Sequence, residues 1–175
     1  MTILIIILVI IAIPFVAAAF IPKQYNVEKQ VTIDKPVQYV FDYIRHIKNQ
    51  AYYSKWQMMD PNVEMTYTGT DGSVGFSSAW KSNNKQVGQG EQTITNIVQE
   101  KRIDMDLHFI KPFEGKSTAY FVTTAASLNQ TIVVWGFNGK MKYPSNLMLL
   151  LMNIKKMIGN DLQTNLNNLK NILEK

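Results

Sequence analysis

Residues 101–115, KRIDMDLHFIKPFEG, contain the clearest β-strand pattern of the chain. Apolar side chains fall at every second position of this stretch, namely Ile103, Met105, Leu107 and Phe109. The positions between them hold Asp104, Asp106 and His108. Because successive side chains of a strand point to opposite faces, the pattern predicts one buried face and one polar face.

The polar face of this strand raises the hypothesis of a metal site or an acid/base centre, since it carries two carboxylates and an imidazole. A metal site needs more converging ligands and exclusion of water, and a catalytic carboxylate needs a perturbing environment. In a sheet that helices cover on one side only, the opposite face meets water. We therefore interpret Asp104, Asp106 and His108 as part of a solvated outer face, and we predict no metal site.

Strand patterns continue on both sides of this stretch, from about residue 62 to about residue 138. Alternating or β-branched segments are separated by short turns rich in Gly, Asn and Ser, as in VEMTYTG, VGFSSAW, VGQGEQTITNIV, TAYFVTTAAS and TIVVWGFNG. No helical pattern interrupts them. A run of about six strands joined by short turns predicts an antiparallel sheet, and VEKQVTI at residues 27–33 adds a short strand before it.

Helical patterns flank the run of strands. At residues 34–49, Pro36 suits the first turn of a helix whose apolar residues share one face. In the last part of the chain, apolar residues recur at helical spacing, namely Leu147, Leu151, Ile154, Ile158, Leu162, Leu169 and Leu173. Gly159 is a weak point in this helix, worth up to about 1 kcal/mol against Ala. A long helix with a wide apolar face needs a surface to cover, so we predict an α+β fold in which a curved antiparallel sheet wraps around the C-terminal helix.

The first part of the chain differs from the rest, because residues 1–22 carry no charge. Residues 3–22, ILIIILVIIAIPFVAAAFIP, would form a helix about 30 Å long, which matches the hydrocarbon core of a bilayer. A cleaved signal peptide is the alternative, since Ala17, Ala18 and Ala19 offer a cleavage site, but no basic residue precedes the apolar run. We predict a transmembrane anchor or uncleaved signal at residues 1–22 and a separate folded domain at residues 23–175.

Lysines directly after the apolar segment predict its orientation. Lys23, Lys29 and Lys35 follow the segment, and no Lys or Arg precedes it. The positive-inside rule then places the globular domain on the cytoplasmic side of a single-pass membrane protein.

Composition and motifs exclude several classes of function. The net charge of +5 is modest and the basic residues are scattered, which does not indicate nucleic-acid binding. The absence of cysteine excludes disulfides and thiolate metal sites. The GKST at residues 115–118 lacks the first glycine of a phosphate-binding loop, and a strand pattern follows it. We find no catalytic motif and predict no cofactor.

The order of these segments resembles the SRPBCC superfamily, which has the START-like helix-grip fold and includes polyketide cyclase-like proteins. The resemblance rests on KWQMMDPNVEMTYTGTDGSVGFSSAW, GQGEQTI, RIDMDLHFIKPFEG and VVWGFNGKMKYPSNLMLLLM, and covers about residues 25–173. The chain looks most like small bacterial members with an N-terminal membrane segment. The resemblance implies a hydrophobic cavity between the sheet and the last helix, and it does not imply catalysis.

The predicted function is a membrane-anchored, non-catalytic domain that binds a hydrophobic small molecule or lipid in this cavity. Met and aromatic side chains suit an adaptable apolar cavity. We predict that the cavity is lined by Trp56, Met65, Trp80, Met105, Phe109, Tyr120, Trp135, Phe137, Met148 and Met152. One alternative is a polyketide cyclase/dehydrase-like enzyme that uses Tyr120 or Glu91 as acid or base. A second alternative is a co-chaperone-like protein-interaction module with a collapsed cavity.

Overall fold

The computed structural model describes residues 2–175, without the side chains of residues 2, 4–9 and 11. A helix, a strand and a group of short helices come first, followed by six strands and then by further helices. The first group is α1 (Thr2–Phe20), β1 (Gln24–Ile33), α2 (Val37–Arg45), η1 (Ile47–Asn49), α3 (Gln50–Tyr53) and α4 (Lys55–Met58). The strands are β2 (Glu64–Thr68), β3 (Ser77–Lys81), β4 (Gln89–Val98), β5 (Arg102–Lys111), β6 (Gly115–Ser127) and β7 (Gln130–Lys140). The chain ends with η2 (Ser145–Leu147), α5 (Met148–Leu151) and α6 (Ile154–Leu173).

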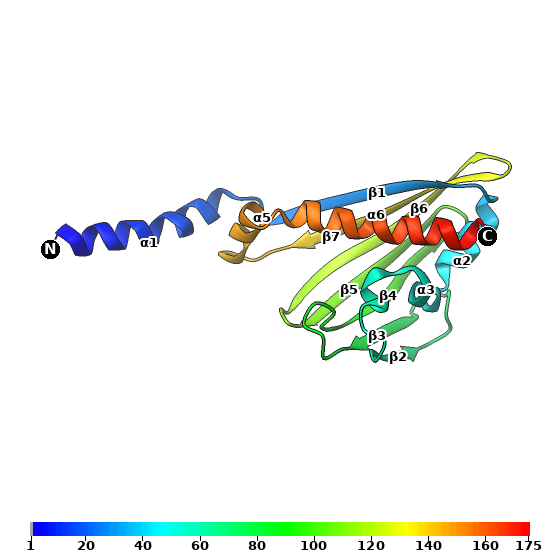
Figure 1. The fold of residues 1–175 in the computed structure, drawn as a ribbon, viewed down its shortest axis with the longest axis horizontal. Coiled ribbons are helices and arrows are strands. Elements are labelled where there is room, and N and C mark those ends of the chain that lie inside the picture. The colour runs from blue at the N-terminus through cyan, green and yellow to red at the C-terminus, as the bar shows by residue number, and fades with distance from the viewer. Residues whose placement is uncertain (1) are drawn as a thin grey trace.

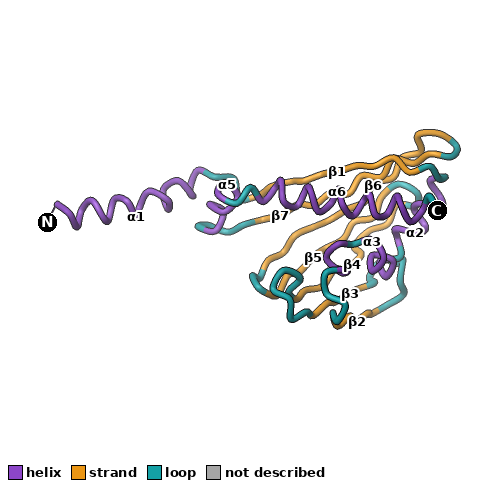
Figure 2. The backbone as a smooth tube through the Cα atoms, viewed as in Figure 1, coloured by secondary structure: helices purple, strands orange, loops and turns teal. Residues whose placement is uncertain are grey.

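The seven strands form one antiparallel sheet in the order β1-β7-β6-β5-β4-β3-β2. Consecutive strands from β2 to β7 are neighbours in the sheet (Figure 1). Strand β1 pairs with β7, so β1 and β2 are the two edge strands. The sheet twists and curves, with α6 lying along its β1 side (Figure 2). The predicted α+β fold, an antiparallel sheet with a long C-terminal helix against it, is confirmed.

The inner face of the sheet, which we define as the face toward α6, forms the core together with α2 and α6. In β5, Ile103 and Met105 are fully buried, as their alternation predicted, while Leu107 and Phe109 are half-buried. From α6, the buried side chains are those of Ile154, Leu162, Asn165, Leu166, Leu169 and Leu173. The predicted apolar stripe of α2 is also buried, through Val40, Phe41 and Ile44. The hydrophobic spacing of each element therefore determines which face it turns toward the core.

Two short helices, α3 and α4, lie between the predicted helix at residues 34–49 and the predicted strands, where we predicted no regular element. Each has four residues, too few for local propensity to stabilise a helix on its own. Tertiary packing stabilises them, because Tyr53 is completely buried and Asn168 of α6 donates to its carbonyl oxygen at 3.2 Å. These helices cover the part of the inner face that α6 does not reach (Figure 1).

Helix α1 extends away from the sheet and contacts the rest of the chain near η2 (Figure 1). Asn146 of η2 donates from Nδ2 to the carbonyl oxygens of Ala18 at 2.6 Å and Ile21 at 2.9 Å. Among the residues that the structure describes, no helix combines the length and the apolar character needed to cross a membrane. This finding contradicts the predicted transmembrane anchor and the predicted localisation as a single-pass membrane protein.

Candidate functional site

Five buried polar side chains lie between the inner face of the sheet and the helices α3 and α6. They are Gln50, Tyr53, Ser78, Trp135 and Asn165, each at most 5% exposed. Each has a side-chain atom without a hydrogen-bond partner among the described residues: Gln50 Nε2, Tyr53 Oη, Ser78 Oγ, Trp135 Nε1 and Asn165 Nδ2. We call these five residues the buried polar cluster. Burial, and to a smaller extent the neighbouring Tyr43, raises the pKa of the Tyr53 hydroxyl, so that it stays protonated.

Helical spacing, strand pairing, a hydrogen bond and an aromatic contact relate the members of the buried polar cluster to one another. Gln50 and Tyr53 lie one turn apart on α3, and Gln50 Oε1 accepts a hydrogen bond from Gln92 Nε2 at 2.8 Å. Gln92 is directly opposite Ser78 in the pairing of β3 with β4. The rings of Tyr53 and Trp135 meet edge to face, with centroids 6.0 Å apart. The cluster therefore extends from β3 across α3 to β7.

Helix α6 contributes Asn165 to the same cluster. Its Oδ1 accepts a hydrogen bond from the backbone N–H of Lys55 at 2.8 Å, two residues beyond Tyr53. An unpartnered polar atom in a protein interior costs about 1–3 kcal/mol. Five such atoms, on β3, α3, β7 and α6, mark positions where hydrogen-bonding groups, from a ligand or from water, would stabilise the fold. This region is our candidate ligand site.

Most members of this cluster were missed by the sequence prediction, which included only Trp135. The signal for Asn165 was present, because it lies between Leu162, Leu166 and Leu169 on the buried stripe of α6. A polar residue inside an apolar helical stripe indicates a buried hydrogen-bonding role. No comparable signal exists for Gln50 and Tyr53, because their burial depends on the two short helices formed through tertiary contacts.

The predicted cavity residues form two aromatic groups on the inner face. Trp80, Phe109 and Phe137 make a half-buried row across β3, β5 and β7, with centroid distances of 5.9 Å and 6.5 Å between successive rings. Trp56 of α4 packs edge to face against Trp135, with centroids 6.3 Å apart. This second group, Trp56 and Trp135, shares Trp135 with the buried polar cluster.

The methionines that we predicted in the cavity lie at different depths. Met105 is buried in the core, and Met65 is half-buried opposite Trp80 in the pairing of β2 with β3. Met148 of α5 is half-buried, whereas Met152, just after α5, is 55% exposed. These methionines line neither of the two pockets described for this structure. Their contribution to the lining of a cavity therefore stays a prediction.

Tyr120 is a correction to the predicted site. Its neighbours Ala119 and Phe121 face the core, so Tyr120 lies on the opposite, outer face of the sheet. There its ring covers Gly136, and its hydroxyl donates to Glu28 and accepts from Asn26. Glu91 also lies on the outer face, beside His108. The two residues proposed as acid or base for an enzyme acting inside the cavity are therefore outside it.

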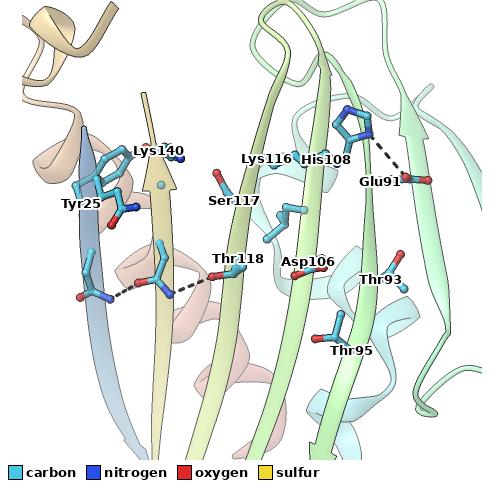
Figure 3. Close-up of a pocket in the computed structure, with 15 residues that line it drawn as sticks. Tyr25, Glu91, Thr93, Thr95, Asp106, His108, Lys116, Ser117, Thr118 and Lys140 are labelled. Carbon is cyan, nitrogen blue, oxygen red and sulfur yellow. Dashed lines mark hydrogen bonds and ion pairs between the residues drawn. The ribbon is translucent and has the colours of Figure 1, made fainter. Parts of the chain in front are cut away.

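The outer face of the sheet is hollowed by a cavity of about 760 Å³ that crosses β1 and β4 to β7 (Figure 3). Most of the residues that line it have polar side chains, and they include Asp106 and His108 of the trio predicted to face solvent. Figure 3 shows Thr93, Thr95 and Asp106 projecting from neighbouring strands into the same space. The outer face is polar, as predicted, but the strand alternation gave no sign of its hollow shape.

Ionisable side chains on this face lie close to one another. His108 Nδ1 lies 3.8 Å from Glu91 Oε1, and its Nε2 lies 3.6 Å from Glu114 Oε1. Arg102 Nε donates to Asp104 Oδ1 at 2.8 Å. Among the described residues, no group of three His, Cys, Asp or Glu side chains is arranged to hold a metal ion.

Comparison with known proteins identifies the class of fold. No protein-family model and no curated protein sequence matches the chain. Among solved structures, a protein from Nitrosospira multiformis has 14% identity and a TM-score of 0.62, with coverage of 85% of this chain and 96% of that one. The Aha1 dimer from Colwellia psychrerythraea has 14% identity and a TM-score of 0.55, with coverage of 86% and 96%.

A third similar structure is Ara h 8.0201, with 12% identity, a TM-score of 0.54, and coverage of 83% of this chain and 97% of that one. At such identities these similarities define the fold alone. The chain has a helix-grip fold, as the sequence resemblance predicted.

Proposed function

We propose that this domain binds a mostly apolar small molecule or lipid between the inner face of the sheet and α6, and does no chemistry on it. The observation that supports the proposal best is the buried polar cluster. A core that exists only for stability pairs its buried polar atoms, because each unpaired atom costs free energy. Five such atoms beside Trp56 and the aromatic row of β3, β5 and β7 match a mostly apolar site with a few polar groups.

The half-buried aromatic row also supports the proposal. Trp80, Phe109 and Phe137 face the side of the sheet that holds the core, yet they keep part of their surface accessible. An apolar ligand that covered these rings would gain free energy roughly in proportion to the apolar area removed from water. The row lies beside the buried polar cluster, since Phe137 is two residues from Trp135 on the same face of β7.

Native mass spectrometry of the full-length chain, followed by extraction and identification of bound molecules, tests the proposal. We expect a mass adduct that organic solvent extracts as an apolar compound. Phe109→Asp should reduce its occupancy at least about tenfold, because a carboxylate in the row opposes an apolar ligand. Val98→Asp is the matched control, since Val98 is 44% exposed at the end of β4. Full occupancy in the folded Phe109→Asp variant would contradict the proposal.

A further inference from the structure

The unpartnered atoms of the buried polar cluster are mostly hydrogen-bond donors. Trp135 Nε1 can only donate. The orientation of the Asn165 amide is fixed by its surroundings, because the backbone N–H of Lys55 requires an acceptor and Oδ1 lies 2.8 Å from it. The atom that remains free is therefore the donor Nδ2. Tyr53 adds a hydroxyl that can donate as well.

The cluster contains no charged side chain. Lys55 is the basic residue that contacts it, through the backbone N–H. Its ammonium group is used elsewhere, in an ion pair with Asp161 at 2.5 Å, and its side chain is 42% exposed. A buried carboxylate or phosphate would therefore meet N–H and O–H dipoles without a cation to compensate its charge, which carries a large desolvation cost.

Aromatic rings surround these donors. Trp135 contacts Tyr53, Trp56 and Phe121, and the centroids of Trp135 and Phe121 are 4.4 Å apart. The environment is thus apolar, neutral and rich in donors. The group that satisfies all three conditions is a neutral acceptor on an apolar body.

From this arrangement we infer that the ligand presents a neutral carbonyl oxygen, of the ketone, ester or quinone type, to Tyr53, Trp135 and Asn165. The inference deepens the proposed function and depends on it, since it names the chemical class of the ligand at the same site. An apolar compound without an acceptor would leave the donors unpaired, and a free carboxylate would enter as an unpaired charge.

Isothermal titration calorimetry of the full-length chain with three matched probes tests the inference. The probes are benzophenone, which carries a neutral carbonyl, diphenylmethane, which lacks it, and diphenylacetate, which carries a carboxylate. We expect benzophenone to bind at least about tenfold more tightly than either of the others, because it alone pairs the buried donors without burying a charge.

The variant Tyr53→Phe removes one donor and keeps the ring, so it should reduce the preference for benzophenone over diphenylmethane severalfold. Tyr43→Phe is the control, since Tyr43 packs against Tyr53 with ring centroids 6.3 Å apart but is not a member of the cluster. The carbonyl stretch of bound ¹³C-labelled benzophenone gives a second readout, and it should shift to lower wavenumber in the parent chain more than in Tyr53→Phe.

The outcomes separate the two proposals. Equal binding of benzophenone and diphenylmethane would overturn the carbonyl preference and leave apolar binding supported. Tighter binding of diphenylacetate would overturn the neutrality of the acceptor. Failure of all three probes and of native mass spectrometry to reveal any bound apolar molecule would overturn the proposed function itself.

Discussion

Asp104, on the outer face of the sheet, makes the stability of the fold depend on pH. Partial burial opposes its ionisation, but the hydrogen bonds from Arg102 and Asn96 and the charge of Arg102 outweigh this effect and hold the pKa of Asp104 below its ordinary value. A carboxylate whose pKa is lower in the folded state stabilises the fold at pH values above its unfolded pKa of about 3.9. This contribution is lost as the pH falls through the folded-state pKa.

We therefore expect Asp104→Asn to lower the free energy of unfolding by about 0.5–1 kcal/mol at pH 7, a size typical of a partly exposed ion pair. The difference in free energy of unfolding between the parent chain and the variant should shrink as the pH falls below about 4. Urea unfolding at pH 7 and at pH 3, followed by tryptophan fluorescence, measures both values. Asp106→Asn is the control, because Asp106 is exposed on the same face. A difference for Asp104→Asn that grows toward acid would contradict the expectation.

Helix α6 contains Gly159 on the side that faces β1. Gly159 is buried, and a Cβ there would lie 3.2 Å from Lys29 Cε and 3.4 Å from Val27 Cγ1. The nearer atom belongs to a flexible side chain that can move by a few tenths of an ångström, and the second distance is ordinary van der Waals contact. Packing against the sheet therefore does not require glycine at this position, and its main effect is to lower the helix propensity of α6.

Gly159→Ala should accordingly stabilise the domain, by up to about 1 kcal/mol, because alanine restricts the unfolded chain and favours the helix. Thermal unfolding followed by circular dichroism at 222 nm measures the change. Gly159→Val tests whether only a small side chain fits here, since valine would press against Val27 of β1. We expect this variant to show no increase in stability. A clear decrease in midpoint for Gly159→Ala would mean that Lys29 cannot move and that this contact requires glycine.

Elements differ in how far the sequence could predict them. The alternation in β5 and the helical spacing in α2 and α6 were sufficient, because each pattern reports a single buried face. The helices α3 and α4 were not predictable in this way, because they are short and depend on contacts with α6 far along the chain. Since α3 carries Gln50 and Tyr53, these two members of the candidate site remained unpredicted for the same reason.

At the scale of the whole molecule, the sequence predicted which surfaces are apolar but not how the surfaces are shaped. The aromatic row of Trp80, Phe109 and Phe137 was expected on the inner face and lies there. Tyr120 was assigned to the wrong face, because its strand β6 carries apolar residues on both sides, at Ala119, Tyr120, Phe121 and Val122, and alternation cannot separate them. The hollow on the outer face is lined in part by Thr95, which lies at the register shift in β4 between Ile94 and Asn96, and no local pattern predicts such a shift.

The attachment of α1 leads to a prediction about the whole molecule. The helix extends away from the sheet, and its contact with the remainder lies near η2, where Asn146 bonds the carbonyl oxygens of Ala18 and Ile21 (Figure 1). Removing residues 1–20 deletes the first of these acceptors and leaves the second. The core formed by the sheet, α2 and α6 keeps all of its buried side chains, since Ala18, which is buried in α1, lies outside that core.

We therefore expect the shortened chain to unfold cooperatively and to lose only about 0.5–1.5 kcal/mol, the net value of one hydrogen bond. Urea unfolding of both chains in the same non-ionic detergent buffer measures this, because α1 exposes Ile3, Ile10 and Ile13 and would otherwise self-associate. Asn146→Ala in the full-length chain removes both bonds while α1 stays in place, so it separates the hydrogen bonds from the rest of the helix. A loss of several kcal/mol in the shortened chain but not in Asn146→Ala would show that α1 stabilises the domain through apolar packing instead.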